Sequence, residues 1–271
     1  MLNTCMRSTI RPLARIALLL TLAGLALSAS AFQPLVTDDT GTQGSDGNQL
    51  EFSFNEDRAE VSGSTDRTYT LPVVYTRGLT ETLDAFAGFS HVKIRSSTPE
   101  GDASGGGNPS FGVKWRFYEN EASKTSFAVK PEIVFPVGAG REIAGLGTGK
   151  TSGNLTLILT QEVSFGAIHV NAGVGRDRYR DSSISSDITT TRASIAPVWD
   201  VTEQWKLALD LGTESARGTD ARVRSNFVEL GAIYSPNKEL DCALGILRTS
   251  DNQSPRTTTD TVTAGVTWRF K

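Results

Sequence analysis

The chain is poor in cysteine and histidine, the residues that most often build metal and nucleophilic sites. Of its two cysteines, Cys5 lies in the N-terminal leader described below, so Cys242 alone remains and no internal disulfide can form. The two histidines, His91 and His169, are not accompanied by a G-x-S-x-G or comparable nucleophile motif. We therefore expect no metal site, no cofactor and no catalytic centre.

Long apolar runs are also absent, except at the N-terminus. Arginines within the first fifteen residues precede the apolar run Ile16–Ser28, and the small residues Ala29-Ser30-Ala31 follow it. This order is typical of a cleaved secretory signal peptide, and the run is too short for a comfortable membrane-spanning helix. We predict a signal peptide over residues 1–31. If the remaining chain enters a membrane, it does so as strands.

Positive charge is scarce in the part of the chain that follows the leader. The formal net charge is −3, and removing the three arginines of the leader takes it to −6. Binding to nucleic acid depends on lysine and arginine that neutralise phosphates, so we expect no nucleic-acid partner.

Strict alternation of apolar and polar residues is the dominant pattern from Leu50 onward. In QLEFSFN, Leu50, Phe52 and Phe54 fall on one face of an extended chain, while Glu51 and Ser53 fall on the other. The same period of two recurs along the chain, and helical periodicity is absent. Counting two less regular segments, the pattern predicts twelve strands.

The connections between these segments alternate in length. Gly78–Thr82 and Asn120–Lys124 are short, whereas Arg58–Arg67 and Pro136–Gly153 are long and polar. Such alternation places every second connection on one rim, as an up-and-down meander requires. Aromatic residues gather near the short turns and the C-terminus, as expected at a membrane interface. They are Tyr75, Trp115, Phe117, Phe165, Trp199, Trp205, Tyr234, Trp268 and Phe270.

These features together predict an all-β protein of the bacterial outer membrane. We expect a twelve-stranded antiparallel up-and-down transmembrane β-barrel over residues 50–271, with both termini periplasmic. Residues 32–49 are expected to form a short periplasmic N-terminal segment. Outer-membrane lipids would then surround the apolar outer face.

The polar half of each strand should face the lumen, because a closed barrel turns its apolar face to lipid. Charged residues on this face form either a salt-bridge ladder that stiffens the barrel or a selectivity lining. Both interpretations remain open at this point. The candidate lumen-lining residues are Lys114, Arg116, Lys130, Glu132, Glu162, His169, Lys206, Asp210 and Glu229.

The stretch AGLGTGKT, Ala144–Thr151, is similar to a phosphate-binding loop. Such a loop needs a following helix whose N–H groups cradle the phosphates, but the segment that follows alternates as a strand. We expect a glycine-rich surface loop and no bound nucleotide.

Several phrases resemble the meta-pathway phenol-degradation family of outer-membrane proteins. They are LVTDDTGTQGSDGNQLEFSFN after the leader, YTRGLTETLDAFAGFS across the first short turn, FGVKWRFYENE, and KPEIVFPVGAGREIAGLGTGKTSGNLTLILT. The resemblance covers most of the mature chain and implies a transporter-like barrel for hydrophobic or aromatic compounds.

We therefore expect a passive channel for small hydrophobic or aromatic solutes, and not an enzyme. Two alternatives from other classes remain: a barrel enzyme that modifies lipid, and a structural or surface-interaction barrel with a plugged lumen.

Overall fold

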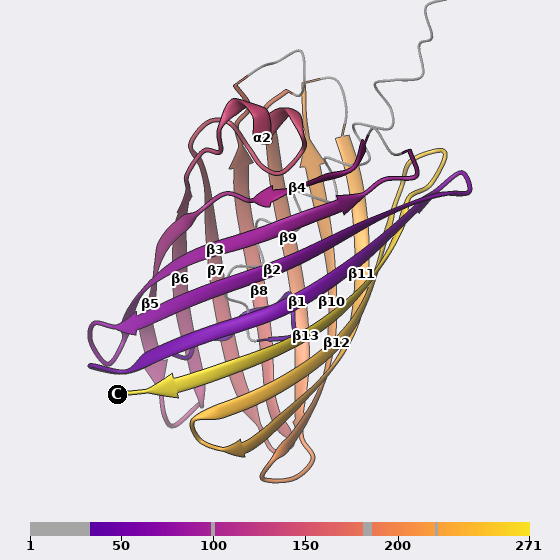
Figure 1. Ribbon diagram of the computed structural model, residues 1–271. Coiled ribbons are helices and arrows are strands. Elements are labelled where there is room, and N and C mark those ends of the chain that lie inside the picture. The colour runs from indigo at the N-terminus through magenta and orange to yellow at the C-terminus, as the bar shows by residue number, and fades with distance from the viewer. Residues whose placement is uncertain (1–32, 99–100, 181–185, 220–221) are drawn as a thin grey trace, which may run out of the picture.

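Strands that follow one another in sequence pair with one another in space and close into a ring (Figure 1). The computed structural model describes residues 33–98, 101–180, 186–219 and 222–271. Within them, the predicted twelve antiparallel barrel strands are confirmed. They are β1 (Asn48–Val61), β2 (Ser64–Gly78), β3 (Leu83–Arg95), β5 (Ser110–Asn120), β6 (Thr125–Val134), β7 (Ser152–Val163), β8 (Gly166–Asp177), β9 (Ile188–Asp200), β10 (Trp205–Arg217), β11 (Arg222–Asn237), β12 (Leu240–Asp251) and β13 (Thr258–Phe270).

The ring closes between the first and the last strand. β1 pairs with β2 on one side and with β13 on the other, in a register that joins Asn48 to Phe270. Closure gives every strand two neighbours, so backbone N–H and C=O groups are satisfied within the wall. In the part of the chain that the structure describes, no helix is long and apolar enough to cross a membrane.

Two short elements were not predicted. The strand β4 (Ala103–Gly106) pairs with the far end of β3, where β5 no longer reaches it. The helix α2 (Ala139–Ile143) lies in the connection between β6 and β7. Each element has five residues or fewer, too few to display a period in the sequence.

Short and long connections lie on opposite rims. The short-turn rim holds the connections 79–82, 121–124, 164–165, 201–204 and 238–239, together with the start of β1 and the end of β13. The other connections form the long-loop rim. The expected loop Arg58–Arg67 is wrong: β1 and β2 continue through it, Arg58 pairs with Arg67, and a two-residue turn at Ser62-Gly63 joins the strands. The apolar outer face ends there, because the outward positions of β1 are Glu56, Arg58 and Glu60, although backbone pairing continues.

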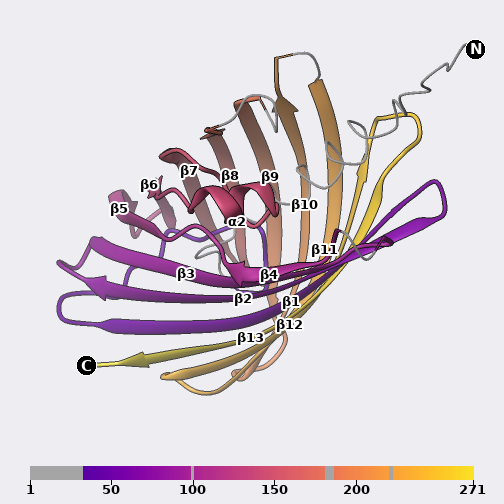
Figure 2. The same cartoon turned by 45° about the horizontal axis from the view of Figure 1, so that its top comes forward.

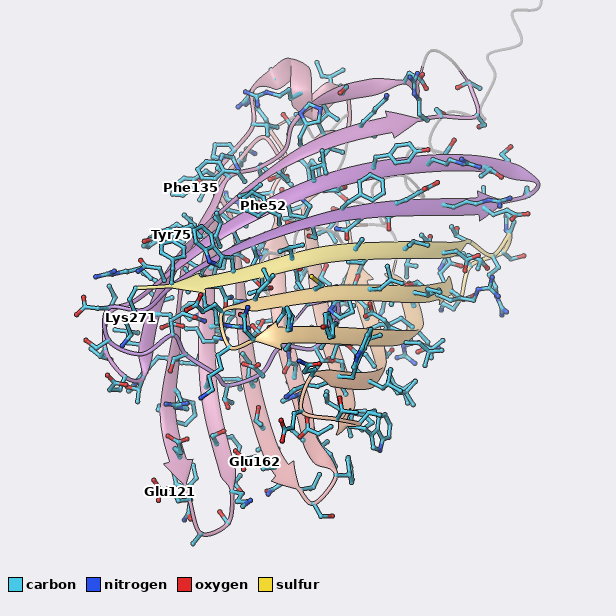
Figure 3. All side chains as sticks on the ribbon, turned by 60° about the horizontal axis from the view of Figure 1, so that its bottom comes forward. Phe52, Tyr75, Glu121, Phe135, Glu162 and Lys271 are labelled. Carbon is cyan, nitrogen blue, oxygen red and sulfur yellow. The ribbon has the colours of Figure 1, made fainter. Side chains whose placement is uncertain are left out.

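The outer face of the ring is apolar, as the alternation predicts. Phe52, Tyr75 and Phe135 lie on it, whereas Glu121 and Glu162 lie at short turns (Figure 3). Near the short-turn rim, aromatic side chains contact one another in pairs: Trp115–Phe117, Phe165–Trp199, Trp205–Tyr234 and Trp268–Phe270, with ring centroids 5.9, 5.8, 4.8 and 4.5 Å apart. A band of Trp and Tyr at one level suits a membrane interface.

Candidate functional site in the barrel lumen

The lumen contains a stretch of the chain itself. Residues 33–47, here called the N-terminal segment, precede β1 and contact inward-facing side chains from opposite walls of the barrel. The sequence predicts a short periplasmic N-terminal segment over residues 32–49 but does not indicate that residues 33–47 of it enter the lumen. These residues carry no periodic pattern that would identify them as part of the wall or show which strands they contact.

Glycines make room for the beginning of the N-terminal segment. A Cβ added at Gly231 would lie 2.9 Å from Pro34 Cγ, and one at Gly245 would lie 2.8 Å from Pro34 Cβ. At Gly265 the same atom would collide with Gln33 Oε1. The three glycines belong to β11, β12 and β13, and together they form a shallow bed on the wall.

Two buried carboxylates hold the next residues. Thr37 donates to Asp210 twice, from its backbone N–H and from Oγ1, each over 2.7 Å, and Ser194 Oγ lies 2.7 Å from the same hydroxyl. The N–H of Val36 donates to Glu229 Oε2 over 3.2 Å. Because Asp210 and Glu229 are almost fully buried, each needs such donors to offset the loss of water.

Asp38 is the electrostatic centre of the site. Its carboxylate lies 2.8 Å from Lys130 Nζ and 3.4 Å from Lys114 Nζ, and the Asp39 carboxylate lies 3.6 Å from the same Lys114. The side chains of Asp38, Lys130 and Lys114 are 7%, 11% and 13% exposed. Lys130 Nζ also lies 5.1 Å from the centre of the Phe86 ring. The ammonium groups of β5 and β6 are thus neutralised by the N-terminal segment.

His169 belongs to the same set of anchoring contacts. Its Nδ1 lies 2.9 Å from Thr160 Oγ1, which accepts the N–H of Thr40 over 3.1 Å. The hydroxyl of Thr40 lies 2.6 Å from Ser126 Oγ. The histidine therefore orients the hydroxyl that holds the segment.

The segment returns to the wall at the short-turn rim. The N–H of Gln43 donates to both oxygens of Asp84, over 3.1 and 3.0 Å, and Asp46 forms an ion pair with Arg77 over 2.6 Å. Gly44 and Asp46 adopt positive φ angles of 71° and 63°, which let the chain reverse into β1.

The nine predicted lining residues divide into two groups. Lys114, Lys130, Asp210 and Glu229 contact the N-terminal segment directly, and His169 contacts it through Thr160. The other four contact the wall or the rim. Glu132 accepts the Asn154 amide over 3.0 Å, Arg116 donates to the Glu81 carbonyl over 3.1 Å, Lys206 pairs with Asp200 over 3.2 Å, and Glu162 pairs with Lys124 over 3.7 Å.

A salt-bridge ladder within the wall was one of the two interpretations of the lumen charges, and at β5 and β6 the ion pairs take a different form. Lys114 and Lys130 share an acid from the N-terminal segment in place of one from the wall. Asp38, Asp84 and the glycine bed were missed by the sequence analysis. The polar run TDDT, residues 37–40, was the available signal, because an acidic stretch before a barrel with inward lysines is a natural partner for them.

Two cavities lie on the short-turn side of the lumen, and the first of them borders the segment. One of about 290 Å³ lies between the segment and the wall, and Glu51, Lys114 and Arg269 are among its lining residues. A second, of about 510 Å³, lies at the short-turn rim beside Lys206 and Asp241. Within the described residues, no group of three or more His, Cys, Asp or Glu side chains could hold a metal ion.

The glycine-rich stretch predicted as a surface loop folds over the opposite mouth. Figure 2 shows α2 within the outline of the ring, between β4 and the strands β7–β9. Leu146 packs on Val92 and Ile94, which are buried residues of β3. The N–H of Gly149 donates to the buried carboxylate of Glu142 over 3.0 Å. That no nucleotide binds here stays a prediction.

Loop residues beyond β8 have shifted pKa values. Tyr179 packs with Ile188 and Ala216, and this burial raises the pKa of its phenol. The backbone N–H of Tyr179 donates to Asp187 over 3.1 Å and holds the pKa of that carboxyl below its usual value. Asp187 therefore remains an anion that fastens this loop at neutral pH.

Residues 22–270 match the family described as "Putative MetA-pathway of phenol degradation". The chain belongs to this family. Comparison with curated proteins found no match.

Solved structures with the same fold are outer-membrane barrels. An outer-membrane channel from Pseudomonas putida F1 superimposes with a TM-score of 0.70 at 14% identity, over 86% of this chain and 98% of that chain. The translocator domain of the autotransporter NalP from Neisseria meningitidis gives 0.53 at 14% identity, over 95% and 97%. The NanC porin gives 0.51 at 8% identity, over 80% and 98%. At these identities the likeness shows the transmembrane β-barrel fold alone.

Proposed function

We propose that this protein is a passive channel for small solutes, with the N-terminal segment as its internal gate. The observation that carries the proposal is the way the segment is held. Hydrogen bonds and ion pairs hold residues 36–46 of the segment. An apolar contact is made by Leu35, which packs against Ala196, Val198 and Ala208 of the wall. Water can replace polar contacts at modest cost, whereas a packed apolar plug would have to expose its core.

We place the barrel in the bacterial outer membrane, with the short-turn rim and both ends of the barrel chain toward the periplasm. The predicted signal peptide, the apolar outer face and the aromatic pairs at the short-turn rim support this placement. The N-terminal segment then enters the lumen from the periplasmic side.

Small aromatic or hydrophobic compounds are the proposed solutes, and those that carry a polar group fit the lumen best. Membership of a family named for phenol degradation supports the aromatic class. The 290 Å³ cavity is lined by charged groups such as Glu51 and Arg269, with the ring of Phe86 beside them. A compound with one aromatic face and one hydrogen-bonding group matches this lining better than a pure hydrocarbon.

Solute uptake into liposomes tests the channel. We expect proteoliposomes to admit benzoate, which is an anion at neutral pH, faster than a sugar of similar mass, and faster than liposomes without protein. The proposal fails if uptake equals that of protein-free liposomes both for the native chain and for a variant with a loosened segment, described in the Discussion. That result would favour the structural barrel with a plugged lumen.

The same liposomes address the lipid-modifying alternative. Release of fatty acid that disappears in His169→Ala would favour a barrel enzyme. We propose that the chain is not an enzyme, because the Nδ1 atom of His169 is engaged with Thr160 in holding the segment.

A further inference from the structure

Arginines form a row on the outer surface near the long-loop rim. Register places Arg95, Arg67, Arg58, Asp260 and Arg248 directly beside one another on the neighbouring strands β3, β2, β1, β13 and β12. We call these five residues the arginine row. Arg58 faces outward, because it is more exposed than Asp57 and Ala59 on either side of it. Residues that pair directly across strands share one face of the sheet, so the other four residues of the row face outward too.

The row lies just beyond the apolar band. On β12 and β13 the exposed apolar side chains Ile246 and Val262 lie two residues closer to the membrane centre. On β1 and β2 that level holds Glu56 and Tyr69, and the exposed Phe54 and Leu71 lie two residues further in. Two residues of a strand span about 7 Å. The row is therefore at the level where a bilayer changes from hydrocarbon to headgroups.

Part of the charge of the row is not neutralised by the protein. Arg248 forms a two-pronged pair with Asp260 over 2.6 and 2.8 Å, Arg67 lies 3.6 Å from Glu56, and Arg95 pairs with Asp102. Among the described residues, Arg58 has no carboxylate within ion-pair distance, and neither does the exposed Arg256 beside the row. Both line a surface hollow of about 350 Å³, together with Arg248, Ser62 and Thr258. The carboxylates of Glu60 and Asp260 also line this hollow, so its three arginines exceed its acids by one.

This concentration of arginine contrasts with the acidic chain as a whole. A guanidinium binds phosphate through two parallel N–H bonds, and a cation near a membrane surface is attracted to anionic lipid. A hydrocarbon-facing wall directly below the hollow would hold acyl chains. Phosphate above and acyl chain below are the two halves of one lipid.

We propose that the hollow between Arg58, Arg248 and Arg256 binds the phosphate-bearing headgroup of an anionic lipid in the leaflet on the long-loop side. The inference rests on the proposed outer-membrane placement. It assigns a lipid-binding role to residues outside the lumen, on which solute passage does not depend.

Binding of a bisphosphorylated lipid A to the purified full-length mature barrel, followed by native mass spectrometry, tests the inference. The variant is Arg58→Gln with Arg256→Gln. The control, Lys124→Asn with Lys271→Gln, removes the same charge at the short-turn rim. We expect about 5-fold weaker binding for each arginine removed, hence about 25-fold for the pair, and no change in the control. A dephosphorylated lipid A should bind weakly to all three proteins.

Three outcomes would overturn the inference: equal binding by variant and native chain, equal loss in the control, or equal binding of the dephosphorylated lipid. Inorganic phosphate alone separates a free anion from a lipid, because binding as tight as that of lipid A would assign the hollow to the anion. Solute uptake measured on the same variants separates this inference from the channel proposal. If the arginine variant loses lipid binding but takes up solute normally, the lipid site is supported. If the native chain binds lipid through these arginines but shows no solute uptake, only the channel proposal is contradicted.

Discussion

Replacing Asp38 by asparagine should release the N-terminal segment from the lumen. The substitution keeps the size of the side chain but removes the charge that Lys130 and Lys114 share. Removing one partner of a buried ion pair costs about 3–5 kcal/mol. Asp39 remains 3.6 Å from Lys114 and limits the loss, so we take the lower value, about 3 kcal/mol. This shifts the equilibrium between held and released segment by roughly 100-fold.

Single-channel recording in a planar bilayer measures this shift. We expect Asp38→Asn to spend far more time in a conducting state than the native channel. The barrel should still resist unfolding on an unheated gel, because the carboxylate lies in the segment and not in the wall. Asp46→Asn is the matched control: its pair with Arg77 lies at the rim, and Asp46 is 79% exposed. An exposed pair contributes at most about 1 kcal/mol, so that change should stay within roughly 5-fold.

A double variant checks the physical cause. Lys130→Met removes the ammonium that contacts Asp38, so each substitution removes the same ion pair and combining the two should cost less than the sum of the single changes. The reasoning is refuted if Asp38→Asn conducts like the Asp46 control, or if the two substitutions are simply additive.

The remaining predictions concern the glycine bed and the orientation of the barrel. Gly245→Ala should raise channel opening, because its Cβ would lie 2.7 Å from Glu229 Oε1 and 2.8 Å from Pro34 Cβ. Gly173→Ala, whose nearest atom is 3.5 Å away, should leave conductance unchanged, and equal effects would contradict a bed for the segment. In a chain whose native cysteine is replaced by serine, Gln253→Cys on the long-loop rim should react with a membrane-impermeant maleimide on intact cells, and Glu121→Cys on the short-turn rim should not. The reverse labelling would invert the proposed topology.

Much of the barrel wall was predictable from local pattern. A strand that separates lipid from water must alternate, so Phe52 and Phe54 identify the outer face and Asp210 the inner face by parity alone. The alternation of short and long connections determined the order of the strands, because neighbours joined by tight turns pair with one another. Aromatic residues such as Trp205 and Tyr234 indicated which rim lies at an interface.

Where a segment lacks a period, the sequence was silent. The helix α2 and the strand β4 are too short to show one, and the continuation of β1 through Arg58 is hidden because charged residues replace the apolar ones on its outer face. The structure of these segments depends on hydrogen bonds to other parts of the chain, and the sequence of the segment does not show which part it will bond to.

The sequence by itself determined which residues face lipid and which face inward, because that choice depends on one side chain and its solvent. Only the tertiary structure decided what the inward residues do. Lys130 meets Asp38 across 92 positions of the chain, and the arginine row exists only because five strands align in one register. Ring closure brings these distant groups together, and no local pattern carries the register that sets their distances.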